Sequence, residues 1–85
     1  MSLEERFNKK NSELQQKIKV EIVKVKEGQS KRNMVQLQTI LTELQKSNTQ
    51  KNIILSYPQI IVDSWDYSDQ LGVELVELAE LYKKI

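Results

Sequence analysis

Apolar residues that recur at intervals of three and four most constrain the fold of this 85-residue chain. The clearest series lies at the end of the sequence: Leu71, Leu75, Leu78, Tyr82 and Ile85. An α-helix turns by roughly 100° per residue, so this spacing places all five side chains on one face. A helix with one apolar face needs a second apolar face to cover it. The sequence therefore predicts helices packed against each other.

A second series of this kind lies in the N-terminal third. Its members are Phe7, Leu14, Ile18, Ile22 and Val25. Residues 12–16 are good helix formers, and Gly28 can end the helix at the position after its C-cap. The predicted helix covers about residues 3–27.

Part of this segment also permits a strand. Residues 18–22 alternate strictly between apolar and charged, and Val20 and Val23 fall off the helical face. Such a density of β-branched residues favours β-structure. The alternative fold is therefore α+β, with a strand at about residues 18–26.

The next predicted helix covers about residues 30–47, with Ser30 as its N-cap. Its apolar residues follow the a and d positions of a heptad, as in a coiled coil: Met34, Leu37, Leu41 and Leu44. The loop around Gly28 is short, so the first two helices are expected to form an antiparallel helical hairpin.

Two further helices are predicted in the C-terminal part. Residues 53–62 are apolar on every side, and Pro58 is expected to start a short helix that ends near Trp65. Asp66 or Ser68 is expected to cap the last helix. The prediction is an all-α bundle of three to four helices, a hairpin plus a C-terminal helix pair, forming a single domain over residues 1–85.

The composition argues against several kinds of chemistry. The chain has no cysteine and no histidine, which removes disulfides, thiolate or imidazole zinc ligands, a thiol nucleophile and a histidine base. Asp63, Asp66 and Asp69 lack the ligand spacing of an EF-hand loop, and two glycines do not make a phosphate-binding loop. We predict no catalytic residues, no metal, no cofactor and no enzymatic activity.

Aromatic residues are concentrated in the C-terminal third, which holds the single tryptophan and all three tyrosines. Trp and Tyr are enriched at binding hot spots. Tyr57, Trp65 and Tyr67 are therefore the candidate partner-binding residues, although each can also serve the core. The predicted function is a non-enzymatic protein–protein interaction or regulatory module that acts through amphipathic helix faces.

The charge is divided between the two parts of the chain. Residues 1–52 carry eleven Lys or Arg and six Asp or Glu, whereas residues 53–85 carry two Lys and six Asp or Glu. The two parts therefore attract each other, either within one chain or between chains. Because so short a chain has few faces to bury, a homodimer is expected.

A nucleic-acid-associated regulator is the alternative function. It would use the basic residues around the first loop: Lys17, Lys19, Lys24, Lys26, Lys31 and Arg32. Three glutamates interrupt this run, and no aromatic residue lies nearby to stack on bases. No apolar stretch approaches the ~20 residues of a membrane span, so a soluble cytoplasmic protein is expected.

Overall fold

The computed structural model describes residues 2–50 and 52–85. It contains four helices in these ranges: α1 (Leu3–Lys26), α2 (Met34–Thr49), α3 (Tyr57–Ser64) and α4 (Gln70–Lys83). No strand occurs in the described part of the chain. The predicted all-α bundle is confirmed, and the alternative with a strand at residues 18–26 is wrong.

Local signals at both ends explain why α1 is helical despite its β-branched residues. Ser2 Oγ accepts a hydrogen bond from the backbone N–H of Glu5 at 3.1 Å, which caps the N-terminus. Gly28 adopts a positive φ of 75° just after the helix. The N–H of Gly28 then reaches the carbonyl of Val25, and the N–H of Gln29 reaches that of Lys24. This pair of bonds is a Schellman motif, which ends the helix where a glycine was expected to end it.

The cap of α2 differs from the prediction. Asn33, rather than Ser30, caps the helix, and its Oδ1 accepts from the N–H of Gln36 at 3.1 Å. Ser30 Oγ instead accepts from the N–H of Arg32 within the loop. The helix therefore begins four residues later than expected and runs two residues further, to Thr49.

The cap of α4 also differs from the prediction. Asp69, rather than Asp66 or Ser68, is the N-cap, and its Oδ1 accepts from the N–H of Leu71 at 3.1 Å. Asp66 accepts from the backbone and hydroxyl of Ser68, which tightens the preceding turn. In α3, by contrast, Pro58 lies in the first turn as predicted.

The first turn of α3 is capped from another helix. Ser56, the residue before α3, makes no side-chain cap of its own. Glu43 on α2 accepts instead from the backbone N–H groups of Ser56, at 2.8 Å, and Tyr57, at 2.9 Å. The Ser56 hydroxyl also donates to Glu43. This carboxylate ties the start of α3 to the middle of α2.

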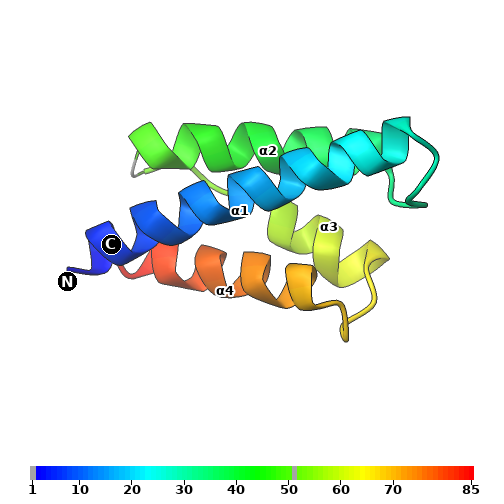
Figure 1. The fold of residues 1–85 in the computed structure, drawn as a ribbon. Helices are drawn as coiled ribbons and strands as arrows, with labels where there is room; N and C mark the ends of the chain where they lie inside the picture. The colour runs from blue at the N-terminus through cyan, green and yellow to red at the C-terminus, as the bar shows by residue number, and fades with distance from the viewer. Residues whose placement is uncertain (1, 51) are drawn as a thin grey trace.

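Figure 1 shows how the four helices enclose the core. The helix α1 packs against both α2 and α4, and α3 connects α2 to α4 on the other side. The buried apolar side chains come from all four helices: Phe7, Leu14, Ile18, Leu37, Ile40, Leu44, Tyr57, Ile61, Leu75, Leu78, Ala79 and Tyr82. At one end of this core, the rings of Phe7 and Tyr82 lie 5.1 Å apart.

One polar residue is fully buried between α1 and α2. Asn11 Nδ2 donates to the carbonyl of Leu44 at 3.0 Å and to Ser47 Oγ at 3.1 Å. Gln15 Nε2 donates to Asn11 Oδ1 at 2.6 Å, so the amide is bonded at both ends. A buried amide with partners on only one level of the facing helix fixes the register of the hairpin.

Candidate protein-interaction surface

The structure separates the three aromatic residues that the sequence suggested as a partner-binding group. Tyr57 is fully buried, and its hydroxyl donates to the carbonyl of Leu75 at 2.8 Å. Burial, with a smaller contribution from the charge of Glu43, raises the pKa of Tyr57 far above its ordinary value. Tyr57 therefore belongs to the core and offers no surface to a partner.

Trp65 is half-buried at the end of α3 and is held on several sides. Its Nε1 donates to Gln36 Oε1 at 3.1 Å, and the guanidinium carbon of Arg32 lies 4.5 Å from the ring centroid. A Cβ added at Gly72 would lie 3.2 Å from Trp65 Cε3, which shows how closely α4 approaches the ring. Trp65 thus connects α2, α3 and α4, and its partly buried ring lines a small hollow beside Arg32.

Arg32 is the centre of an ion-pair cluster beside Trp65. Its Nε donates to Glu21 Oε1 at 2.8 Å, and its two terminal nitrogens donate to Asp69 at 2.7 and 3.1 Å. The bidentate bond from Arg32 holds the pKa of Asp69 below its ordinary value. For Glu21, partial burial acts to raise the pKa, but hydrogen bonds from Arg32 and Lys24 outweigh it and lower the pKa.

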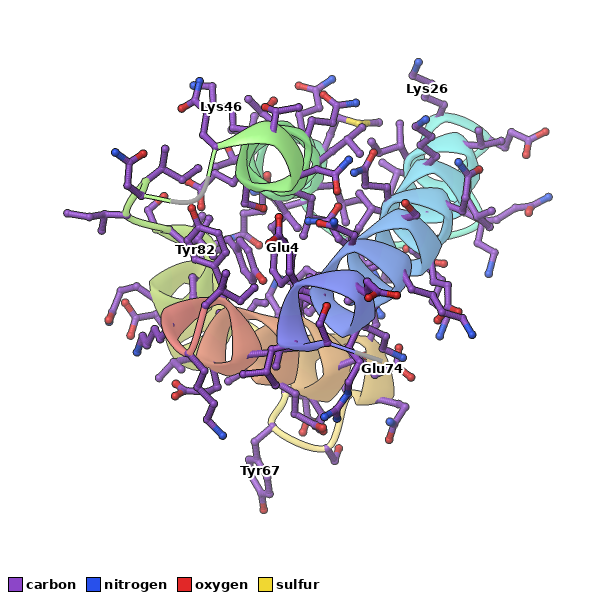
Figure 2. The ribbon with its side chains drawn as sticks, turned by 90° about the vertical axis from the view of Figure 1, so that its left-hand side faces the viewer. Glu4, Lys26, Lys46, Tyr67, Glu74 and Tyr82 are labelled. Carbon is purple, nitrogen blue, oxygen red and sulfur yellow. The ribbon has the colours of Figure 1, made fainter. Side chains whose placement is uncertain are left out.

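Tyr67 is the one predicted aromatic residue that is open to solvent. It is 94% exposed in the turn between α3 and α4, and Figure 2 shows its ring pointing away from the bundle. Of the three candidates, the structure therefore places one in the core, one in a clamp between helices and one in solvent. They do not form a single patch.

The six basic residues of the alternative prediction do not share one face. Lys17 contacts Glu74 on α4 at 2.8 Å, and Lys24 lines the same hollow as Lys17 and Leu71, so these two cations lie on the α4 side of α1. Lys19 and Lys26 lie on the opposite side of the helix, since each residue adds roughly 100°. Figure 2 shows Lys26 pointing away from Glu74. Lys31 lies in the loop, beside the Arg32 cluster.

The three aspartates of the α3–α4 segment have separate roles. Asp63 accepts from Gln59, Asp66 accepts from Ser68, and Asp69 pairs with Arg32. Within residues 2–50 and 52–85, no three acidic side chains come together in a way that could hold a metal ion.

Sequence reasoning missed an apolar hollow between α3 and α4. The hollow has a volume of about 430 Å³ and is lined mainly by Ile53, Ile54, Leu55, Pro58, Ala79 and Tyr82. The Tyr82 hydroxyl shapes it by accepting from the N–H of Ile53 at 3.1 Å and donating to the carbonyl of Gln50 at 2.7 Å. These two bonds hold the segment before α3 against the C-terminal end of α4.

Exposed apolar side chains surround this hollow. Ile54 is 96% exposed at its edge, and Val62 is 71% exposed one helical turn beyond Pro58. The hollow and these side chains are called the α3–α4 surface below. Residues 53–62 are apolar on every side, so periodicity gave no means of telling which of them face solvent.

Comparison with family models, with curated proteins and with solved structures gave no match. Across the described ranges, none of the helices combines the length and apolar character needed to cross a membrane.

Proposed function

We propose that this chain is a non-enzymatic interaction module that binds an amphipathic helix of a partner protein on the α3–α4 surface. The observation that carries the proposal is the exposure of Ile54 and Val62 beside an apolar hollow. Large apolar side chains in water are stabilised when a partner covers them, by about 25 cal/mol per Å² of buried area.

The shape of the surface supports a helical ligand. The first turn of α3 and the C-terminal end of α4 border the hollow, and residues 52–55 form its remaining wall. A groove of this kind accepts apolar side chains that project from one face of a partner helix at intervals of three and four. The complete lack of histidine and cysteine supports a role without catalysis.

The direct test compares two valines that have the same exposure. Val62 on α3 is 71% exposed, and Val35 on α2 is 70% exposed. Proteins captured from the native source by the wild-type chain are quantified beside those captured by Val62→Glu and Val35→Glu. A true ligand of the α3–α4 surface is lost with Val62→Glu and Ile54→Glu, and is retained with Val35→Glu.

Two outcomes would contradict the proposal. In the first, Val62→Glu and Val35→Glu capture the same proteins in the same amounts. In the second, a captured protein is lost equally with both variants while circular dichroism shows that both are folded. Either result would remove the α3–α4 surface as the binding site.

The nucleic-acid alternative needs its cations on one continuous surface. The opposite positions of Lys17 and Lys19 on α1, and the ion pairs of Lys17, Lys24 and Arg32, count against such a surface. This alternative predicts retardation of nucleic acid in a gel at low ionic strength, with affinity that falls steeply with salt.

A further inference from the structure

The outer side of the α1–α4 pair carries a groove that the proposed function does not use. Two hollows lie along it. One, of about 670 Å³, lies between the N-terminal part of α1 and the C-terminal part of α4. The other, of about 390 Å³, lies between the C-terminal part of α1 and Leu71 at the start of α4. In the view along the helices, neither α2 nor α3 covers this side (Figure 2).

The two walls of the larger hollow carry opposite charge. The α1 wall presents three cations and one anion: Arg6, Lys9, Lys10 and Glu13. The α4 wall presents three anions and one cation: Glu74, Glu77, Glu80 and Lys84. Each wall therefore has an excess of two charges, positive on α1 and negative on α4.

Part of this charge is not neutralised by the described residues of the chain. Lys10 and Lys17 both contact Glu74, at 3.8 and 2.8 Å, and these contacts join α1 to α4. Among residues 2–50 and 52–85, Arg6, Lys9 and Glu77 form no ion pair, and Glu80 contacts only Lys83 of its own helix. The outer side of the pair therefore presents a basic ridge beside an acidic ridge.

Such a surface is complementary to itself in only one of two symmetric arrangements. Rotation by half a turn about an axis parallel to the helices places α1 of each copy over α4 of the other, so positive faces negative twice. Rotation about an axis across the helices places α1 over α1 and α4 over α4, so like charges meet. Electrostatics favours the first arrangement.

The rotation about a parallel axis keeps each residue at its own height along the helices. The ring contact of Phe7 and Tyr82 shows that these residues share one height. The helices run in opposite directions (Figure 1). Lys9, two residues further along α1, and Glu80, two residues earlier in α4, therefore both lie about 3 Å further in, at 1.5 Å per residue. Lys9 of one copy meets Glu80 of the other.

In the second hollow, two apolar residues share a height in the same way as Lys9 and Glu80 do. The Lys17–Glu74 contact sets the height. Val20 lies three residues beyond Lys17, and Leu71 lies three residues before Glu74, so the two again share a height. Val20 is 53% exposed, although it is a β-branched residue in the middle of a long helix. The same rotation brings Val20 of each copy to Leu71 of the other.

We propose that the chain self-associates through this groove as a twofold dimer, with its axis parallel to α1 and α4. Lys9 of each copy lies against Glu80 of the other copy, and Val20 of each copy lies against Leu71 of the other. Because exposed ion pairs supply much of the complementarity, the association weakens as salt rises and screens them.

Charge reversal tests the arrangement. The full chain is studied by sedimentation equilibrium, and circular dichroism checks the fold of each variant. We expect a dimer for the wild type at low salt, with a dissociation constant that rises about tenfold or more at high salt. The variants Lys9→Glu and Glu80→Lys each place like charges together at both contacts, and each is expected to be monomeric.

An equimolar mixture of Lys9→Glu and Glu80→Lys is the decisive sample. In a mixed pair, acidic α1 faces basic α4 at one contact, and the wild-type ridges face each other at the second contact, so dimers return. Lys46→Glu, an exposed charge reversal on α2, is the matched control and leaves the dimer intact. If charge reversal disturbs folding, the neutral variants Lys9→Gln and Glu80→Gln test the same contact and weaken the dimer less.

A wild-type chain that stays monomeric at high micromolar concentration would overturn the proposal. A mixture that fails to associate, or charge-reversed variants that dimerise as well as the wild type does, would also overturn it. None of these results bears on the α3–α4 surface, because the groove shares no lining residue with the α3–α4 hollow.

Discussion

The α1–α2 hairpin and the α3–α4 pair reach stability by different means. The hairpin has long helices, caps from its own residues and a buried amide that fixes its register. The pair has an eight-residue helix that is capped from α2, and its apolar side chains Ile54 and Val62 remain in solvent. The hairpin therefore acts as the scaffold, and the pair carries the surface that a partner would cover.

A core truncation should give the largest effect and would test whether the hairpin is the scaffold. Ile18 on α1 is fully buried, so Ile18→Ala leaves a cavity and should lower the free energy of unfolding by about 2–5 kcal/mol. Val23, on the same helix, is 52% exposed, so Val23→Ala should change it by less than about 0.5 kcal/mol. Urea denaturation measures both. Similar losses for the two variants would show that α1 does not have one buried face.

Removing the buried amide should give a smaller loss. Asn11→Ala deletes the bonds to Leu44 and Ser47 and leaves their buried polar atoms without this partner, at a cost of about 1–3 kcal/mol. Gln15→Ala removes one partly buried bond and should cost about 1 kcal/mol or less. Thermal unfolding followed by circular dichroism separates the two. If Asn11→Leu is as stable as the wild type, then the amide contributes to register rather than to stability.

The link between the hairpin and the pair should show the smallest effect. Arg32→Lys keeps the charge but loses the bidentate bond to Asp69 and the stacking on Trp65, which should cost about 1 kcal/mol. Lys24→Met is the control. It removes the other, partly exposed cation that pairs with Glu21 and leaves the bonds of Arg32 in place.

This link should also depend on pH. The pKa values of Asp69 and Glu21 are both lowered in the folded state, so their contribution is complete above the ordinary carboxyl pKa and is lost as pH falls below it. The wild type should therefore lose more melting temperature on acidification below about pH 4 than Arg32→Lys does. Parallel curves for the two proteins would contradict this assignment.

The three- and four-residue spacing of apolar residues predicted the helices well, because each such series marks a buried helix face. Leu14, Ile18 and Leu44 were predicted to be in the core, and all three are fully buried. The caps were harder to predict, because several residues with suitable side chains lie close together at each start. Ser30 and Asn33 compete at α2, and Asp66, Ser68 and Asp69 compete at α4. At α4, the residue that caps the helix also pairs with the distant Arg32, a contact that no local pattern shows.

The interaction surface was harder still to predict. In residues 53–62, nearly every position is apolar, so the sequence did not distinguish the buried Tyr57 and Ile61 from the exposed Ile54 and Val62. The position of Trp65 depends on Arg32, which lies more than thirty residues earlier in the chain. Contacts at such separation follow from how the helices pack and leave no local pattern.

The carboxylate of Glu43 makes α3 dependent on α2. An isolated peptide of residues 57–64 would lack this acceptor for its first amide groups, and eight residues are too few to sustain a helix alone in water. We therefore expect α3 to form late in folding, after the hairpin has positioned Glu43. Any partner that binds α3 thus recognises an element that exists only once the rest of the molecule is assembled.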